Sequence, residues 1–271
     1  MKTKVIIVGI VLTMISISCK HKQNSTETSN LQAQKSTDNK DHKTHWEYSG
    51  EVGPEHWAEL IKDADCGGQH QSPINIVTID VKKDSNLNPL DIQYSKETKI
   101  YEVINNGHSI QYNFEQGDYI NYQGDRFDLK QIHFHESAEH TINGIRYPLA
   151  IHMVHTNKQG EYLVLAVMVK EGENSQPFEF LENYLPLKKG ETKTINSAFD
   201  LTQNLPNNRG YYTYTGSLTT PPCTEDVYWF VFKEPITVSL KQVVILRDLM
   251  PLDNFRNEQP LNDRIVKMTA Y

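Results

Sequence analysis

The chain has 271 residues, of which 38% are hydrophobic and 23% charged, and its formal net charge is −7. This is the composition of an ordinary globular protein, and the length allows one large domain or two small ones. No basic stripe runs through the sequence, which excludes nucleic acid as an expected partner.

The first 18 residues have the pattern of an export signal. Lys2 and Lys4 precede an apolar run over residues 5–17, and small residues follow it. The run is too short to span a bilayer comfortably. A buried helix is the alternative, but the polar residues that come next offer nothing for it to pack against. We therefore expect residues 1–18 to direct export.

Cys19 directly follows the small residue Ser18, which resembles a bacterial lipoprotein signal whose cysteine is acylated. Ser16 departs from that pattern, because an aliphatic residue is usual three positions before the cysteine. Two alternatives therefore stay open. Either a lipid on Cys19 holds the protein at a membrane of the periplasm or cell envelope, or the chain is simply secreted after cleavage nearby.

Residues 19–44 are rich in Lys, Gln, Ser, Thr, Asn and Asp and contain almost no large apolar residue. Such a segment cannot bury enough surface to offset its chain entropy, and we expect a flexible tether. The first aromatic residues then arrive together, at Trp46, Tyr48 and Trp57. No linker or repeat follows, so we expect one domain over residues 45–271.

Strand patterns dominate this domain. Short β-branched and aromatic runs, bounded by turn pairs such as Asn-Gly, predict strands at 100–104, 109–114, 131–135, 151–154, 163–169, 211–215 and 228–232. The run at 163–169 is apolar throughout, which is typical of a central strand covered on both faces. Helical patterns are few and predict helices at 55–63, 176–184 and 239–249, the last with Ser239 as N-cap. The predicted fold is mainly β with short peripheral helices.

The segment Gln-Ile-His-Phe-His at 131–135 suggests a metal site. Alternate side chains of a strand share a face, so His133 and His135 point the same way, about 6.6 Å apart along the strand. Two imidazoles at this spacing can bind one tetrahedral ion, but a third ligand must come from elsewhere. A lone His-x-His is more often an ordinary polar pair than a metal site.

A second histidine-bearing strand offers two candidates for that third ligand, His152 and His155. Their offset of three residues places them on opposite faces, so only one can join the pair, and spacing leaves the choice open. Three histidines without a thiolate would leave a fourth position for water, which is the open coordination of a catalytic zinc.

Several motifs now match a known family, the α-class carbonic anhydrases. The segments that carry the resemblance are Gly-Pro-Glu-His-Trp at 53–57, Gln-Ser-Pro-Ile-Asn at 71–75, Asn-Asn-Gly-His at 105–108, 131–135, Glu-His-Thr at 139–141, His-Met-Val-His at 152–155 and Gly-Ser-Leu-Thr-Thr-Pro-Pro-Cys at 216–223. Their order and spacing match from about Trp46 to the C-terminus. The resemblance implies a single domain with a large twisted, mostly antiparallel central sheet, and reversible hydration of carbon dioxide to bicarbonate and a proton.

The resemblance also implies the metal ligands and the cysteine pairing. His133, His135 and His152 would bind Zn²⁺, His155 would pack behind the strand, and His140 would be a buried structural histidine. Zinc on three imidazoles lowers the pKa of bound water to about 7, a value that carbonic anhydrases themselves exemplify. Cys66 and Cys223 resemble the bridged pair of bacterial members, although two buried free thiols are the alternative; an oxidising compartment permits the bridge.

By the same resemblance, zinc-bound hydroxide attacks carbon dioxide while Thr219 accepts its hydrogen bond and Glu139 accepts the proton of Thr219. The expected substrate pocket consists of Val154, Val164, Leu218, Thr220 and Trp229. His108 matches the proton shuttle, since an imidazole titrates near neutral pH. The polar residues expected to order water beside it are Tyr48, Asn106, Gln111 and Gln131.

One position departs from the family pattern. Two residues before the third zinc histidine the family usually has Glu, which accepts a hydrogen bond from that ligand, and here the residue is Ala150. Losing such a partner typically costs ~10–100-fold in metal affinity or activity. We therefore expect normal folding with less tightly held zinc.

Two other functions are alternatives for a sequence of this kind. A non-catalytic binding domain on the same fold typically lacks a zinc histidine, whereas all three are present here. A secreted zinc hydrolase acting on esters would use the same nucleophile, but no separate leaving-group acid is evident. The sequence carries no prediction of the oligomeric state.

Overall fold

The described part of the chain is built mainly from strands. The computed structural model describes residues 45–271, so the expected export signal at 1–18, the tether at 19–44 and Cys19 lie outside it. The strands are β1 (Asn75–Ile76), β2 (Lys82–Asp84), β3 (Asp91–Gln93), β4 (Thr98–Asn105), β5 (Ile110–Phe114), β6 (Tyr119–Tyr122), β7 (Asp125–His135), β8 (Thr141–Ile142), β9 (Ile145–Arg146), β10 (Leu149–Thr156), β11 (Tyr162–Glu171), β12 (Thr192–Phe199), β13 (Tyr211–Gly216), β14 (Val227–Phe232), β15 (Ile236–Val238) and β16 (Lys267–Thr269).

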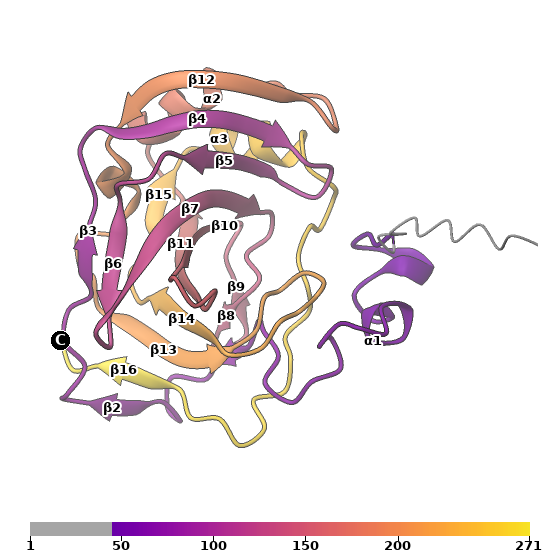
Figure 1. Cartoon of the computed structure of the whole chain (residues 1–271), viewed down its shortest axis with the longest axis vertical. Helices are drawn as coiled ribbons and strands as arrows, with labels where there is room; N and C mark the ends of the chain where they lie inside the picture. The colour runs from indigo at the N-terminus through magenta and orange to yellow at the C-terminus, as the bar shows by residue number, and fades with distance from the viewer. Residues whose placement is uncertain (1–44) are drawn as a thin grey trace, which may run out of the picture. The chain divides into compact units, whose positions relative to one another are not determined.

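Within residues 45–271, these strands form a 13-stranded sheet and a 3-stranded sheet, the latter in the order β1-β8-β9. The long path of the large sheet runs β12-β4-β5-β7-β10-β11-β14-β13-β16-β2 (Figure 1). Its pairs are antiparallel except for β11 with β14, β11 with β15, and β16 with β2. The expected mainly β fold with a large, mostly antiparallel sheet is confirmed.

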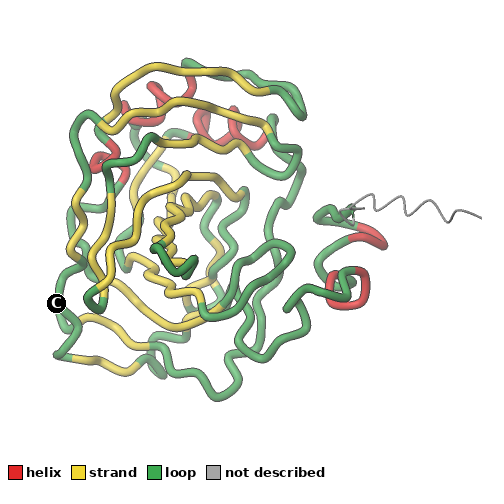
Figure 2. The backbone as a smooth tube through the Cα atoms, in the orientation of Figure 1, coloured by secondary structure: helices red, strands yellow, loops and turns green. Residues whose placement is uncertain are grey.

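The helices are short, and Figure 2 shows them away from the centre of the sheet. They are η1 (Gly50–Val52), α1 (Trp57–Leu60), α2 (Gln176–Glu182), η2 (Leu201–Asn204) and α3 (Leu240–Arg247). Ser239 caps α3 through a capping box, as the sequence predicts. The helix predicted at 55–63 shrinks to one turn, because the backbone N–H of Asp65 donates to the Pro222 carbonyl and takes the chain toward another loop.

Strand β11 separates two apolar clusters. Leu163, Leu165, Val167 and Val169 belong to one cluster, and the alternate residues Val164, Ala166 and Met168 to the other. Both faces of the strand are therefore covered, as its continuous apolar run predicts. Among the described residues, no helix is long and apolar enough to cross a membrane.

The register of β7 and β10 brings the histidines together. His133 lies opposite His152, and His135 lies opposite Ala150. A register shift follows between Val154 and His155. The two strands therefore present three imidazoles on neighbouring positions of the same sheet.

Candidate metal centre

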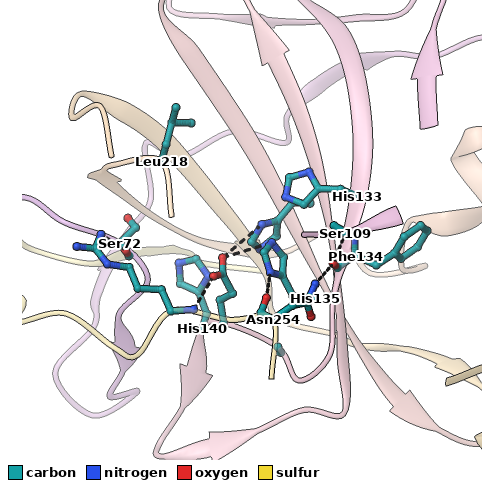
Figure 3. A network of polar contacts seen from close by, with 12 residues as sticks. Ser72, Ser109, His133, Phe134, His135, His140, Leu218 and Asn254 are labelled. Carbon is teal, nitrogen blue, oxygen red and sulfur yellow. Dashed lines mark hydrogen bonds and ion pairs between the residues drawn. The ribbon is translucent and has the colours of Figure 1, made fainter. Parts of the chain in front are cut away.

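Three histidine side chains converge on one point beside β7 and β10. One ring nitrogen from each of His133, His135 and His152 lies within 4.8 Å of the others. His135 and His152 are buried, and His133 is half-buried. Figure 3 shows the rings of His133 and His135 beside each other, with Asn254 next to them. Three nitrogens at this spacing can hold one metal ion.

Two of the three rings are oriented by a hydrogen bond from their other nitrogen. Nδ1 of His133 is 2.8 Å from Oε1 of Gln131, and Nδ1 of His135 donates to the Asn254 carbonyl over 2.6 Å. These bonds leave the Nε2 lone pair of each ring free to bind a metal. Nε2 of His135 is buried and has no hydrogen-bond partner within the described residues.

His152 differs from the other two. Both of its ring nitrogens are buried and neither has a hydrogen-bond partner within residues 45–271. Its Nδ1 is 3.8 Å from Oε2 of Glu139, and Nε2 of His135 is 3.5 Å from the same oxygen. Nδ1 of His152 and Nε2 of His135 therefore both lie near the same oxygen of Glu139.

The surroundings of these histidines favour neutral imidazoles, which can bind a metal cation. Burial, together with neighbouring His135, holds the pKa of His133 well below its usual value, and the same two causes act first on His152. Neutral imidazoles are the form that binds metal. An all-nitrogen set of three, with orphaned buried ring nitrogens, fits a zinc ion with an open fourth position.

Glu139 is a buried carboxylate behind this point. Burial raises its pKa, while His135, a hydrogen bond from the Thr219 side chain and Arg256 act in the opposite direction. Its Oε1 accepts the backbone N–H of Arg256 over 2.9 Å. A divalent cation beside Glu139 would favour its charged form further. Thr219 is buried, with 6% of its surface exposed.

The remaining histidines of the same strands have other partners. Nδ1 of His155 donates to the Leu163 carbonyl over 3.2 Å, and its Nε2 lies 2.6 Å from the Tyr94 hydroxyl. Both ring nitrogens of His155 are thereby occupied behind the strand. His140 is fully buried, and its Nε2 lies 2.7 Å from the Tyr214 hydroxyl.

A cleft of ≈ 120 Å³ is lined by two of the three histidines, His133 and His135. Its lining includes most of the polar residues that the sequence singled out, together with Trp46 and Ser109; the predicted members are Tyr48, Asn106, His108, Gln111, Gln131, His133, His135 and Thr220. Polar side chains therefore line one cleft together with His108, His133 and His135.

Apolar side chains lie on the other side of His152. Val154, Val164 and Trp229 belong to one cluster, against which half-buried Leu218 packs. The strand register explains their closeness, because Val154 pairs with Val164 and Val164 pairs with Trp229. The ring of Trp229 lies 5.0 Å from that of His152.

Cys66 and Cys223 form a disulfide, with their Cα atoms 4.9 Å apart. Cys223 follows the turn that carries Thr219, and its backbone N–H donates to the Thr220 carbonyl over 2.8 Å. The bridge thus joins this turn to the segment that follows α1.

Sequence reasoning missed Asn254, Arg256 and the contact of Trp46 with His108. Asn254 orients His135, and the guanidinium of Arg256 donates to the Cys66 and Ser72 carbonyls. Both residues lie in an irregular segment near the C-terminus, where no periodic pattern marks a partner more than a hundred residues away. No local signal could have identified them.

Fold and site together define a mainly β protein with a cluster of three histidines that could hold a metal ion, two of which line a cleft. The family model for eukaryotic-type carbonic anhydrases matches residues 52–270. A carbonic anhydrase from Nostoc sp. is 38% identical over 225 residues, spanning 82% of this chain and 84% of the relative. One from Klebsiella pneumoniae is 39% identical over 227 residues, spanning 82% and 90%.

A solved structure agrees with these relatives. The α-carbonic anhydrase from Thermovibrio ammonificans, in complex with the inhibitor sulfanilamide, superimposes with a TM-score of 0.79 at 43% identity, covering 83% of this chain and 99% of that one. The chain belongs to the eukaryotic-type, or α, carbonic anhydrase family. It is an enzyme of the class that hydrates carbon dioxide, typically with zinc.

Proposed function

We propose that this enzyme interconverts carbon dioxide and bicarbonate with one zinc ion held by His133, His135 and His152. The observation that carries the proposal is the convergence of three ring nitrogens within 4.8 Å. Bound zinc would act as a Lewis acid that activates a water molecule for attack on carbon. The protein's own residues orient that water, hold the substrate and remove the proton.

Thr219 and Glu139 would orient the attacking water. The Thr219 hydroxyl would donate its proton to the Glu139 carboxylate, whose pKa the Thr219 side chain lowers. The hydroxyl oxygen of Thr219 is then left as an acceptor for a proton of the water. This arrangement turns a lone pair of the water toward the substrate, which is an orientation effect rather than a proton transfer.

Carbon dioxide has neither charge nor dipole, so an apolar wall should hold it. Val154, Val164, Leu218 and Trp229 supply that wall beside His152. Thr220 lies on the polar side of the cleft. Bicarbonate carries a charge that the apolar wall does not solvate, which favours its release.

Each hydration also produces a proton that must leave the cleft. His108 lines the cleft and is half-buried, and burial lowers the pKa of its imidazole. A neutral imidazole can accept the proton and then release it to buffer. The same cleft is lined by Tyr48, Asn106, Gln111 and Gln131, which would order the water that carries the proton from the metal to His108.

We further propose that residues 1–18 direct export, that Cys19 carries a lipid, and that residues 19–44 tether a catalytic domain formed by 45–271. The Cys66–Cys223 disulfide supports export, because such bridges persist in oxidising compartments. Mass spectrometry of the protein isolated from cells would show an acylated Cys19 as the first residue; an unmodified N-terminus elsewhere contradicts the anchor.

The catalytic proposal is tested by removing and restoring metal. Purified protein should hydrate carbon dioxide in stopped-flow measurements, lose this activity with its zinc in chelator, and regain it with added Zn²⁺. Ester hydrolysis measured in parallel should be much slower. Hydration that persists in metal-free protein, or an ester rate that exceeds the hydration rate, would contradict the proposal.

A further inference from the structure

The imidazole of His108 is held by stacking rather than by hydrogen bonds. It lies against the indole of Trp46, with ring centroids 3.8 Å apart and planes inclined by 13°. Nδ1 of His108 is buried and has no hydrogen-bond partner among residues 45–271. One face of the ring is therefore fixed, while a nitrogen that could carry a proton is left without an acceptor in contact.

The carboxylate of Glu47 lies next to that nitrogen. Its Oε2 is 4.0 Å from Nδ1 of His108, and the side chains of both residues are 26% exposed. Both backbone polar groups of Glu47 form hydrogen bonds. Its N–H donates to the Val52 carbonyl, and its carbonyl accepts a hydrogen bond from Nε1 of Trp57. The backbone of Glu47 is thus held in place, and its carboxylate lies beside His108.

Lys189 holds the same carboxylate from the other side. Its Nζ is 3.1 Å from Oε1 of Glu47. The stem of Lys189 lies over the turn that carries His108, because a Cβ atom added at Gly107 would sit 2.6 Å from Cε of Lys189. Gly107 has φ +87°, where a side chain would also be strained. Exposed His45 lies 3.5 Å from the same Oε1 of Glu47.

We infer that Glu47 is a positioning residue for proton export, which holds the His108 ring in place and stabilises its protonated form. The inference rests on the proposed function of His108 as proton shuttle. Protonation puts an N–H on Nδ1, and Glu47 is the carboxylate placed to attract it. The neutral ring gains nothing comparable, so the interaction favours proton uptake from the cleft.

The surroundings of His108 have opposing effects on the pKa of its imidazole. Burial lowers the pKa of His108, Glu47 raises it, and Lys189 and His45 lower it. A shuttle works best with a pKa near the operating pH, because it must both accept and release the proton. Glu47 raises the pKa of His108 and so opposes the effect of burial, while Lys189 lowers this pKa and makes the rise smaller.

The direct test is an NMR titration of the His108 ring in the zinc-loaded protein, with the signal assigned by its loss in His108→Ala. Glu47→Gln should lower the proton affinity of His108 about threefold, the size expected of one partly exposed ion pair. Glu47→Asp should restore part of it. Lys189→Met should change the affinity in the opposite direction. An unchanged His108 titration in Glu47→Gln would overturn the inference.

A kinetic readout separates this role from a structural one. In weak buffer the hydration rate of Glu47→Gln should fall about threefold with the proton affinity, and added imidazole should restore it. Zinc content and the carbon dioxide/bicarbonate exchange rate should stay unchanged, because neither needs proton export. Equal losses of exchange and hydration would mean that Glu47 only supports folding, which also overturns the inference.

The same set of variants distinguishes failure of the inference from failure of the proposed shuttle. If His108→Ala hydrates carbon dioxide at the full rate in weak buffer, the shuttle role is wrong, whatever Glu47 does to the titration. If His108→Ala is slow but Glu47→Gln matches the unaltered protein in rate and titration, the shuttle stands and the role of Glu47 is wrong.

Discussion

Ala150 precedes His152 by two positions on β10, so the methyl group of Ala150 and the imidazole of His152 project from the same face of the strand. Ala150 is fully buried and offers no acceptor, and neither ring nitrogen of His152 has a hydrogen-bond partner within the described residues. The other two candidate ligands have Gln131 and the Asn254 carbonyl as partners. One of the three rings therefore lacks an orienting bond.

This asymmetry predicts that Ala150→Glu slows zinc release. A carboxylate at position 150 would accept the free N–H of His152 and hold the ring in its metal-binding orientation. Such partners are typically worth ~10–100-fold in metal affinity. The measurement is the rate of zinc transfer to a chelator, followed by a colour indicator.

Two variants serve as controls. Ala150→Met adds comparable volume without an acceptor and should not slow release. Gln131→Ala removes the partner of His133 and should speed release. Identical release rates for the unaltered protein and a folded Ala150→Glu variant would show that another group already orients His152.

The disulfide should contribute to stability. Cys66 and Cys223 are 157 positions apart, and the chain-entropy model gives up to ~5 kcal/mol for a loop of this length. The double variant Cys66→Ala/Cys223→Ala should therefore unfold at lower urea concentration. Reduction of the unaltered protein should reproduce the loss, whereas coincident urea curves for all three samples would refute it.

His155 should make the fold sensitive to acid. Burial lowers its pKa to about 4 in the folded chain, against about 6.5 in an unfolded one. The unfolded chain therefore binds the extra proton first, so stability that is complete above pH 6.5 falls as the pH drops toward 4. The loss due to His155 is about 3 kcal/mol at most.

The check compares urea unfolding of metal-free protein and metal-free His155→Gln at several pH values. The variant should be less stable at pH 7, because the bonds to Tyr94 and Leu163 are disturbed. Its further decline between pH 6.5 and 4 should be smaller than that of the unaltered protein. Parallel declines would assign the acid sensitivity to other groups.

Much of the fold follows from local patterns. Residues 163–169 predicted a central strand, and Ser239 predicted the start of a helix, because apolar runs and caps act within a few residues. Strand β12 was not predicted: it pairs only with β4, and most of its residues are polar and exposed. This edge strand buries only Ile195 and Phe199, which are too few to give an alternating apolar pattern.

The candidate site also has a part that local patterns predict and a part that they do not. His133 and His135 could be paired from their spacing, because both lie on one strand. The choice between His152 and His155 depends on the register of β10 against β7, which places His152 opposite His133. Register is a relation between strands, so spacing within β10 could not decide it, and only the family resemblance did.

The contacts around His108 are non-local as well. Glu47 reaches Lys189 across 142 positions of the chain. Taken alone, each of these two charged residues is typical of a solvent-exposed surface. Only the folded chain shows that they meet beside the His108 turn.

The central claim is that His133, His135 and His152 together hold the zinc, and the zinc content of single alanine variants tests it most directly. Purified protein should contain one zinc per chain, and His133→Ala, His135→Ala and His152→Ala should each lose most of it while remaining folded. His155→Ala should keep its zinc if it folds. Full zinc in a folded His152→Ala variant, or complete loss from a folded His155→Ala variant, would contradict the account.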